Sequence, residues 1–294
     1  ADLTIMEEGN ELVERLQANG RLPMFTPCCP AWISYAETFL PDLLPHLSTC
    51  KSPQQMMGAL IKTYFAEKEG VDPTDVVVVS IMPCTAKKHE CARDEMAASG
   101  QRDVDYVLTT REIGRMVREA GLDLAGMSGK EFDDPLGIST GAGVLFGATG
   151  GVMEAALRTA HAVLTGEDLA RLDVQPVRGL AGSREATVTV GDRRIKVAVA
   201  HGLANARELV EAIAAGQAEV DFVEIMACPG GCIGGGGQPR PACEETRRQR
   251  VAAIYQVDAG MALRCSHHNP AVQQLYAEFL GAPLGHRSHR LLHT

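Results

Sequence analysis

The chain has 294 residues, of which 45% are hydrophobic, so it is long enough to bury a substantial core as one large domain or two lobes. Aspartate and glutamate outnumber lysine and arginine by 37 to 28, the formal net charge is −9, and no long basic run is present, so a nucleic-acid partner is not expected. The longest apolar run, at 75–82, is far shorter than the roughly 20 residues of a membrane-spanning helix, and the sequence does not open on a signal-peptide pattern, so no membrane span is expected.

The first part of the sequence predicts two helices on either side of a pair of cysteines. Apolar residues recur mostly at helical spacing from Leu3 to Gln17, and Ala-Asn-Gly at 18–20 is expected to end this helix. The short apolar run Leu-Pro-Met-Phe at 22–25 then leads into the cysteine pair, and a second helix is expected from Trp32.

Two later strands also run directly into cysteines. The run Asp-Val-Val-Val-Val-Ser-Ile at 75–81 has the pattern of a buried strand and precedes Met-Pro-Cys, and Val-Asp-Phe-Val-Glu-Ile-Met at 220–226 precedes a second cysteine loop. Residues 186–200 are typical of a hairpin around Gly191 and Asp192. Further helices are expected near 52–69, 110–120, 151–165, 205–215 and 270–280.

This alternation predicts an α/β fold with mostly parallel sheets flanked by helices. We expect two lobes, at about 1–135 and 136–294, with the active site in the cleft between them. Loops that leave the carboxyl ends of parallel strands meet at one crevice, so the three cysteine loops are expected to share one site. The glycine-rich segment at 139–151 is expected to be a loop of close approach before a helix.

Cys28 and Cys29 stand side by side between Pro27 and Pro30. Neighbouring side chains diverge, so one metal ion seldom takes both sulfurs, and an unstrained disulfide between neighbours is hard to form. The two cysteines are therefore expected to have different roles. The nine cysteines are odd in number and spread along a long chain, which fits a reducing compartment better than a disulfide scaffold.

The loop Cys-Pro-Gly-Gly-Cys-Ile-Gly-Gly-Gly-Gly at 228–237 places Cys228 and Cys232 at the end of a strand. A flexible linker is the alternative interpretation, but linkers rarely fix cysteines at a strand end. Glycines allow backbone N–H groups to approach a bulky inorganic ligand closely. The loop therefore favours a cofactor site.

Cys84 follows Pro83, which blocks continuation of the strand ladder, and Lys87 three residues later can offset the charge of a thiolate-rich cofactor. Together with one cysteine of the pair, Cys228 and Cys232, it completes a set of four thiolates. Iron–sulfur clusters and structural zinc both use such sets, so the count leaves both open, although ligands about two hundred residues apart favour a buried cofactor. Structural or incidental roles are expected for the remaining cysteines, which are Cys50, Cys91, Cys243 and Cys265. Surface or packing roles are expected for the five histidines of the tail, 266–294.

The three cysteine loops, Thr-Pro-Cys-Cys-Pro-Ala-Trp, Met-Pro-Cys-Thr-Ala-Lys-Lys-His-Glu and Met-Ala-Cys-Pro-Gly-Gly-Cys-Ile-Gly-Gly-Gly-Gly-Gln-Pro, resemble the three signatures of iron-only (FeFe) hydrogenases. The resemblance extends to 141–160 and to the final Ser-His-Arg-Leu-Leu-His-Thr, and so covers essentially the whole chain. It implies reversible reduction of protons to dihydrogen at an H-cluster. This cofactor is a four-iron four-sulfur (4Fe-4S) cubane bridged by a cysteine to a two-iron centre that carries CO, cyanide and azadithiolate.

The resemblance also implies a role for each site residue. Cys29, Cys84 and Cys228 would hold the cubane, and Cys232 would hold it and bridge to the two-iron centre. Cys28 would pass protons to a relay through Glu8, Ser48, Glu11 and Arg15; the spacing of Glu8, Glu11 and Arg15 puts them on one helix face, which would otherwise be interpreted as an ordinary solvated face. Lys87 would bind a cyanide, Gln54 would approach the inner ligands, and the residues expected to surround the two-iron centre are Met82, Pro83, Met226 and Phe146.

The sequence departs from the family pattern at two points. Pro27 stands where family members most often have serine, which removes a hydroxyl and a backbone donor. An earlier strand and an Ala-Pro-x-Val-Arg loop of the family do not precede Ala1, so we expect a fragment of the catalytic domain that lacks its N-terminal part and is inactive when isolated.

The resemblance further implies maturation proteins and an electron partner, either ferredoxin or an NAD(P)-linked subunit. The fused tail is similar to that of one-chain hydrogenases, so a cytoplasmic parent protein from an anaerobic bacterium is expected. Two alternatives stay open: a hydrogen-sensing regulatory relative, and an iron–sulfur assembly relative without the two-iron centre. Cys28 argues against the first, since such sensors often lose that cysteine, and Lys87 with the intact 228–237 loop argues against the second.

Overall fold

The computed structural model describes residues 1–18 and 20–294. Its α-helices are α1 (Asp2–Gln17), α2 (Pro30–Phe39), α3 (Pro53–Leu60), α4 (Ala66–Glu69), α5 (Lys87–Glu90), α6 (Thr110–Glu119), α7 (Gly141–Leu145), α8 (Gly151–Thr165), α9 (Leu203–Ala214), α10 (Glu244–Gly260), α11 (Pro270–Leu275) and α12 (His286–Leu292). Its strands are β1 (Met24–Phe25), β2 (Val79–Met82), β3 (Tyr106–Thr109), β4 (Ser183–Val190), β5 (Arg193–His201) and β6 (Phe222–Met226). Short π-helical turns at Ile61–Phe65 and Tyr276–Leu280 extend α3 and α11.

The helices expected from apolar spacing are confirmed to within a few residues. The first, α1, ends at Gln17; of the expected stop at 18–20, Asn19 lies outside the described residues. No helix in the described part of the chain is both long enough and apolar enough to cross a membrane.

Within the described residues the larger sheet has the strand order β1-β6-β5-β4. Strand β6 pairs in parallel with both β1 and β5, and only β4 and β5 pair antiparallel. The predicted α/β fold, mostly parallel with one hairpin at Gly191 and Asp192, is therefore confirmed.

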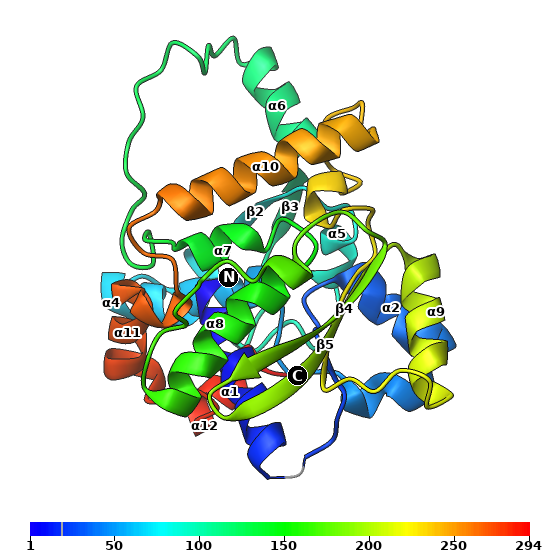
Figure 1. Ribbon diagram of the computed structural model, residues 1–294. Coiled ribbons are helices and arrows are strands. Elements are labelled where there is room, and N and C mark those ends of the chain that lie inside the picture. Colours follow the sequence, from blue (N-terminus) through cyan, green and yellow to red (C-terminus); the bar gives the residue numbers. More distant parts are fainter. Residues whose placement is uncertain (19) are drawn as a thin grey trace.

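Helices cover both faces of this sheet (Figure 1). Successive side chains of a strand point to opposite faces, so in β5 Val197 and Val199 pack with α1 and α8, whereas Ala198 and Ala200 pack with α2 and α9. Strand β6 is buried along its whole length, as its continuous apolar pattern predicted. Glu224 is the exception in polarity, and it accepts hydrogen bonds from the backbone N–H groups of Gly150 and Met153 at the start of α8 (2.6 and 2.8 Å).

The smaller sheet pairs β2 with β3 in parallel. The expectation of a buried strand at 75–81 is wrong in part, because the strand covers only Val79–Met82 and its outer face is exposed, with Val79 at 49% and Ile81 at 54%. An all-apolar run predicts burial on both faces, but here only β3 accompanies β2 among the described strands, and one face lacks a cover.

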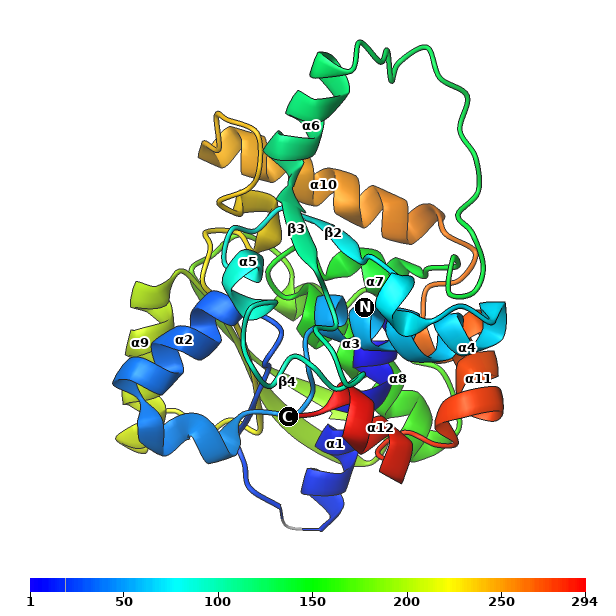
Figure 2. The ribbon, with the colours of Figure 1, turned by 180° about the vertical axis from the view of Figure 1, so that it is seen from behind.

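The carboxyl ends of β1, β6 and β2 each lead into a cysteine loop. Figure 2 shows β2 and β3 lying beside α5 and α3, with the open connection 120–140 arching away from the body. The lobe boundary near residue 135 stays a prediction, and it falls within this connection; β1, from the earlier segment, nevertheless pairs with β6 from the later one.

Candidate functional site

A cavity of about 360 Å³ lies where the three cysteine loops meet. Each residue that the resemblance assigned to the metal group lines it: Cys28, Cys29, Gln54, Met82, Pro83, Cys84, Lys87, Phe146, Met226, Cys228 and Cys232. Residues up to 204 positions apart in the chain are thus gathered around one volume, because the strands that carry them end on the same side.

Glycines allow these loops to approach one another. A Cβ on Gly231 would lie 2.6 Å from Met226 Sδ, and one on Gly237 would lie 2.8 Å from the Pro83 carbonyl carbon. At Gly235 the added atom would collide with the Pro83 carbonyl oxygen. The sequence predicts that the glycine run permits close contact with an inorganic ligand; the structure shows Gly235 and Gly237 fitting against the backbone of the Cys84 loop.

The spacing of the cysteines expected to bind metal distinguishes a single zinc ion from an iron–sulfur cluster. These cysteines are Cys29, Cys84, Cys228 and Cys232. Sulfurs on one tetrahedral zinc ion lie about 3.8 Å apart, because each Zn–S bond is about 2.3 Å. Over the described residues, the groups of three or more candidate ligand atoms that lie mutually within 4.8 Å include none of these four. No three of these sulfurs therefore lie mutually within 4.8 Å in the described structure, which is wider than their spacing on a single zinc ion.

Burial makes these thiols costly to ionise without a metal. It raises the pKa of Cys232 to about 12 and that of Cys228 to about 11, and the neighbouring Cys29 and Cys84 add to both shifts. For Cys29, burial again raises the pKa, opposed by the backbone N–H groups of Ala227 and Trp32; the Ala227 nitrogen lies 3.5 Å from the Cys29 sulfur. Metal cations would have to displace the thiol protons on binding, as they do at other cysteine sites.

Lys87 enters the cavity as a charged donor. Its ammonium group donates to the Cys28 carbonyl oxygen (3.1 Å) and to both carboxylate oxygens of Glu90 (2.9 and 3.1 Å). Burial would lower the pKa of Lys87, but Glu90, with smaller contributions from Cys28 and Cys84, outweighs it and raises that pKa. The lysine therefore stays cationic beside the thiols.

Glu90, which the sequence did not single out, lies beside Lys87 at the cavity. It is buried, and besides Lys87 it accepts hydrogen bonds from Ser52 (2.9 Å) and Gln54 (3.2 Å). Its position three residues after Lys87 in α5 was a usable signal, because residues at this spacing share a helix face. Gln54 in turn accepts a hydrogen bond from Ser80 on β2 (2.9 Å), so one network connects the cavity wall to the smaller sheet.

The residues expected to relay protons lie on α1 and in the loop after residue 46. Arg15 donates to Glu11 (2.6 Å) and to the Leu47 carbonyl oxygen (2.8 Å), and Ser48 donates to the other Glu11 oxygen (2.6 Å). Glu8 is fully buried, and within the described part of the structure neither of its carboxylate oxygens has a hydrogen-bond partner. The outer portion of the expected route is thus hydrogen-bonded, and Glu8 is a separate buried carboxyl.

Glu8 interacts electrostatically with Glu11 on one side and with Cys28 on the other. Burial raises the pKa of Glu8 well above its usual value, and Glu11 raises it further. Burial also raises the pKa of Cys28 well above its usual value, with Glu8 as the next contribution. For both groups the shift favours the protonated form.

Two family models match the chain. One describes the iron-only hydrogenase large subunit, C-terminal domain, and matches residues 1–236; the other describes the iron hydrogenase small subunit and matches residues 244–294. Both regions are joined in this one chain.

Individual relatives agree with these models. The chain is 52% identical, over its whole length, to an NADP-reducing hydrogenase subunit of Solidesulfovibrio fructosivorans, of which it spans 51%. It is 53% identical over 87% of its length to the periplasmic iron hydrogenase large subunit of Nitratidesulfovibrio vulgaris, of which it spans 61%. It is also 35% identical to cytosolic iron-sulfur assembly component 3 of Rattus norvegicus, of which it spans 63%.

A solved FeFe-hydrogenase structure from Chlamydomonas reinhardtii superposes with a TM-score of 0.85 at 47% identity, covering the whole of this chain and 81% of that one. The chain spans about half to two thirds of the length of the curated relatives named above. With a family model matching 236 of its 294 residues and the cysteine loops gathered around one cavity, the chain belongs to the iron-only hydrogenase family.

Proposed function

We propose that this chain forms the H-cluster domain of a hydrogenase that interconverts protons and dihydrogen. The observation that carries the proposal is the gathering of Cys29, Cys84, Cys228 and Cys232 around one cavity that also contains Cys28 and Lys87. Membership of the iron-only hydrogenase family supports the same chemistry.

The four cysteines would hold the cubane, and Cys232 would also bridge to the two-iron centre. This assignment is supported by a sulfur spacing too wide for one ion. When bound, the H-cluster supplies the electrons and the iron site at which hydrogen is formed or split. Met82, Met226 and Phe146 would exclude water from it, and such a dry pocket with few fixed donors tunes a metal centre.

Lys87 would present its ammonium group to a cyanide of the cofactor. In the structure this group already binds Glu90 and the Cys28 carbonyl, which fix its position at the cavity wall. An ammonium group has three donors, and in the structure they contact the Cys28 carbonyl and both Glu90 oxygens, so donation to a cyanide would replace one of the two Glu90 contacts. Glu90 is therefore proposed as a positioning residue for Lys87.

Cys28 would deliver protons, and Glu8, Ser48, Glu11 and Arg15 would pass them to the surface. The hydrogen bonds Ser48 to Glu11 and Arg15 to Glu11 support the outer steps. Glu8 supports the inner step, because its carboxyl is buried without a partner among the described residues and its raised pKa favours the protonated form, which has both a donor and an acceptor free. By turning its carboxyl group it would receive a proton on one side and release one on the other.

The electron partner is proposed to be ferredoxin or an NAD(P)-linked subunit, and the relative named as an NADP-reducing hydrogenase subunit favours the second. A cytoplasmic parent protein is proposed because large-subunit and small-subunit regions are fused in one chain. Maturation proteins would be needed to insert the two-iron centre.

The iron–sulfur assembly relative gives a second candidate function, favoured by the 35% identity to such a protein. The two functions differ in the two-iron centre. An assembly protein would bind a cubane only, whereas the hydrogenase would use the whole cavity, including Lys87 and Cys28.

Loading the chain with its iron–sulfur and two-iron groups distinguishes these functions. Infrared bands of bound CO and cyanide are expected for the wild-type chain, and hydrogen evolution is expected for the full-length parent protein, since the isolated chain is expected to be inactive. Cys28→Ala should keep the bands and lower turnover sharply, and Cys84→Ser should lose iron, whereas Cys243→Ser, which changes an exposed thiol, should do neither. Iron without CO and cyanide bands would favour the assembly function, and full iron content in Cys84→Ser would contradict both.

A further inference from the structure

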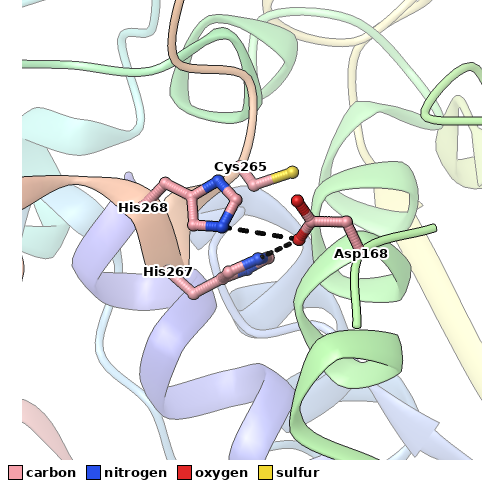
Figure 3. A group of neighbouring side chains, drawn as sticks. All are labelled: Asp168, Cys265, His267 and His268. Atoms are coloured by element: carbon pink, nitrogen blue, oxygen red, sulfur yellow. Dashed lines mark hydrogen bonds and ion pairs between the residues drawn. The ribbon is translucent and has the colours of Figure 1, made fainter. Parts of the chain in front are cut away.

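A second group of metal-binding side chains lies outside the cysteine cavity. Asp168, Cys265, His267 and His268 each offer one ligand atom, and these atoms all lie within 4.8 Å of one another. Figure 3 shows the two imidazole rings and the Asp168 carboxylate pointing toward one another, with the Cys265 sulfur beside the carboxylate. The sequence did not indicate this group as a metal site, because Asp168 follows α8 whereas the other three residues precede α11, about 100 residues later.

One nitrogen of each imidazole lies near the same oxygen of the Asp168 carboxylate. Asp168 Oδ1 lies 2.7 Å from His267 Nε2 and 3.5 Å from His268 Nε2. The ligand atoms of a tetrahedral zinc ion lie about 3.3 to 3.8 Å apart, given bonds of about 2.0 to 2.3 Å. The side chains of Asp168 and His268 are 44% and 45% exposed. They are therefore free to make the small shifts that would bring the observed distances to those around a zinc ion.

A partner outside the group fixes the orientation of His267. Its Nδ1 lies 3.2 Å from the hydroxyl oxygen of Thr159, a fully buried residue of α8. This contact leaves Nε2 directed at the Asp168 carboxylate. Imidazoles that bind metal are usually held in this way through their second nitrogen. A simple hydrogen bond between Asp168 and a histidine would not require the Cys265 thiol beside it, whereas a metal site would use that thiol as a ligand.

The charges also suit a divalent ion. An ionised Cys265, an ionised Asp168 and two neutral imidazoles together carry two negative charges. The nearby arginines, Arg158 and Arg264, are both occupied in ion pairs with Asp258, at 2.9 and 2.6 Å. Thiolate, imidazole and carboxylate ligands in a set of four are typical of zinc.

We propose that Asp168, Cys265, His267 and His268 form a zinc site that links the loop after α8 to the segment before α11. The buried cysteine forms the floor of the site, and the exposed Asp168 and His268 form its entrance. The bound ion braces α8, which packs on α1, the helix of the proposed proton relay. The site is independent of the cysteine cavity and of the reaction proposed for it.

Zinc binding is measured on the chain with its iron–sulfur group loaded, by zinc content after dialysis and X-ray absorption at the zinc edge, where iron does not contribute. We expect one zinc per chain, with one sulfur at about 2.3 Å and nitrogen or oxygen atoms at about 2.0 to 2.2 Å. Cys265→Ser should remove the sulfur. His268→Ala and Asp168→Asn, both at exposed positions, should weaken zinc binding at least as much as loss of an outer-shell partner does, about 10- to 100-fold.

Matched controls separate this site from other thiols and histidines. Cys243→Ser and His286→Ala change an exposed cysteine and an exposed histidine elsewhere and should leave zinc affinity unchanged. Zinc should also raise the midpoint of thermal unfolding of the wild type and not that of His268→Ala. A zinc environment of about four sulfurs, or an affinity unaffected by both His268→Ala and Asp168→Asn, would overturn the proposal.

Discussion

Replacing Glu90 with alanine tests the network that holds Lys87 at the cavity. In the wild type both side chains of the pair are buried, at 9% and 6% exposure, and the Glu90 carboxylate accepts from Lys87, Ser52 and Gln54. The variant leaves the Lys87 ammonium group with the Cys28 carbonyl as its remaining partner in the described structure. Removing one member of a buried ion pair costs about 3 to 5 kcal/mol, so we expect a loss of that size in the free energy of unfolding at pH 7.

The sign of the pH dependence follows from the direction of the Lys87 shift. Glu90 raises the pKa of Lys87, so the wild-type pair contributes stability that is fully present below the unfolded lysine pKa and is lost as pH rises through the folded one. In Glu90→Ala the main opposition to burial is removed and only the smaller contributions of Cys28 and Cys84 remain, so we expect this pKa to fall. The difference in stability between wild type and variant should therefore be largest near neutral pH and shrink toward alkaline pH.

Urea denaturation at several pH values measures this difference. Arg115→Ala is the control, because Arg115 and Glu119 form an exposed pair on one helix, and such a pair contributes only about 0.3 to 0.5 kcal/mol. Glu90→Gln keeps the shape and removes the charge, and should show most of the loss. If Glu90→Ala lowered the free energy of unfolding no more than Arg115→Ala does, Lys87 would not depend on Glu90 for its position, and this prediction would be refuted.

Three further predictions concern the proton route, the cysteine loops and acid stability. Glu8→Gln should reduce hydrogen evolution by about a hundredfold or more while the CO and cyanide infrared bands stay unchanged; equal turnover would exclude Glu8 from the route. Gly235→Ala should reduce iron content, because its Cβ would collide with the Pro83 carbonyl oxygen; Gly260→Ala, which meets nothing within 4 Å, should not, and equal iron contents would contradict the packing argument. Asp258, whose pKa its arginine partners lower from 3.8 to about 2 against the effect of burial, contributes stability above pH 4 that is lost as pH falls through 2. The stability gap between wild type and Asp258→Asn should therefore narrow by about 2 kcal/mol between pH 5 and pH 2 in urea melts, and a constant gap would refute this.

Local patterns were sufficient to predict most elements and the cysteine loops that line the cavity, whereas Gln54, Phe146 and the two methionines followed from the family resemblance. Each cysteine loop is a contiguous motif directly after an apolar run, so its position at a strand end could be inferred from neighbours in the sequence, and the fold then gathers Cys28, Cys84 and Cys232. The hairpin at Gly191 and Asp192 was likewise predictable from turn chemistry.

Properties that depend on distant segments were not predictable in this way. The exposure of Val79 and Ile81 depends on what lies over β2, which no pattern within 75–81 encodes. The relation of Cys265 and its neighbouring histidines to Asp168 arises because α8 and α11 lie near one another, and nothing in the local sequence of either segment indicates this. Glu90 was missed for a different reason: a charged residue near the end of a short helix is ordinarily solvated, and only tertiary packing buries it.

Neighbouring carboxylates of α1 show how packing shifts the pKa of one residue type in opposite directions on one helix. Glu7 is buried, yet its pKa is lowered, because hydrogen bonds from His293, Tyr276 and the Leu284 N–H together outweigh the effect of burial. Glu8, the next residue, has no such partners among the described residues, and burial raises its pKa instead. Glu11 lies one turn further along, where Arg15 and Ser48 contact its two oxygens at 2.6 Å. The proposed proton route would use the raised pKa of Glu8 at its inner end and the cation Arg15 at its outer end, and both properties follow from the partners that the rest of the fold supplies to each position.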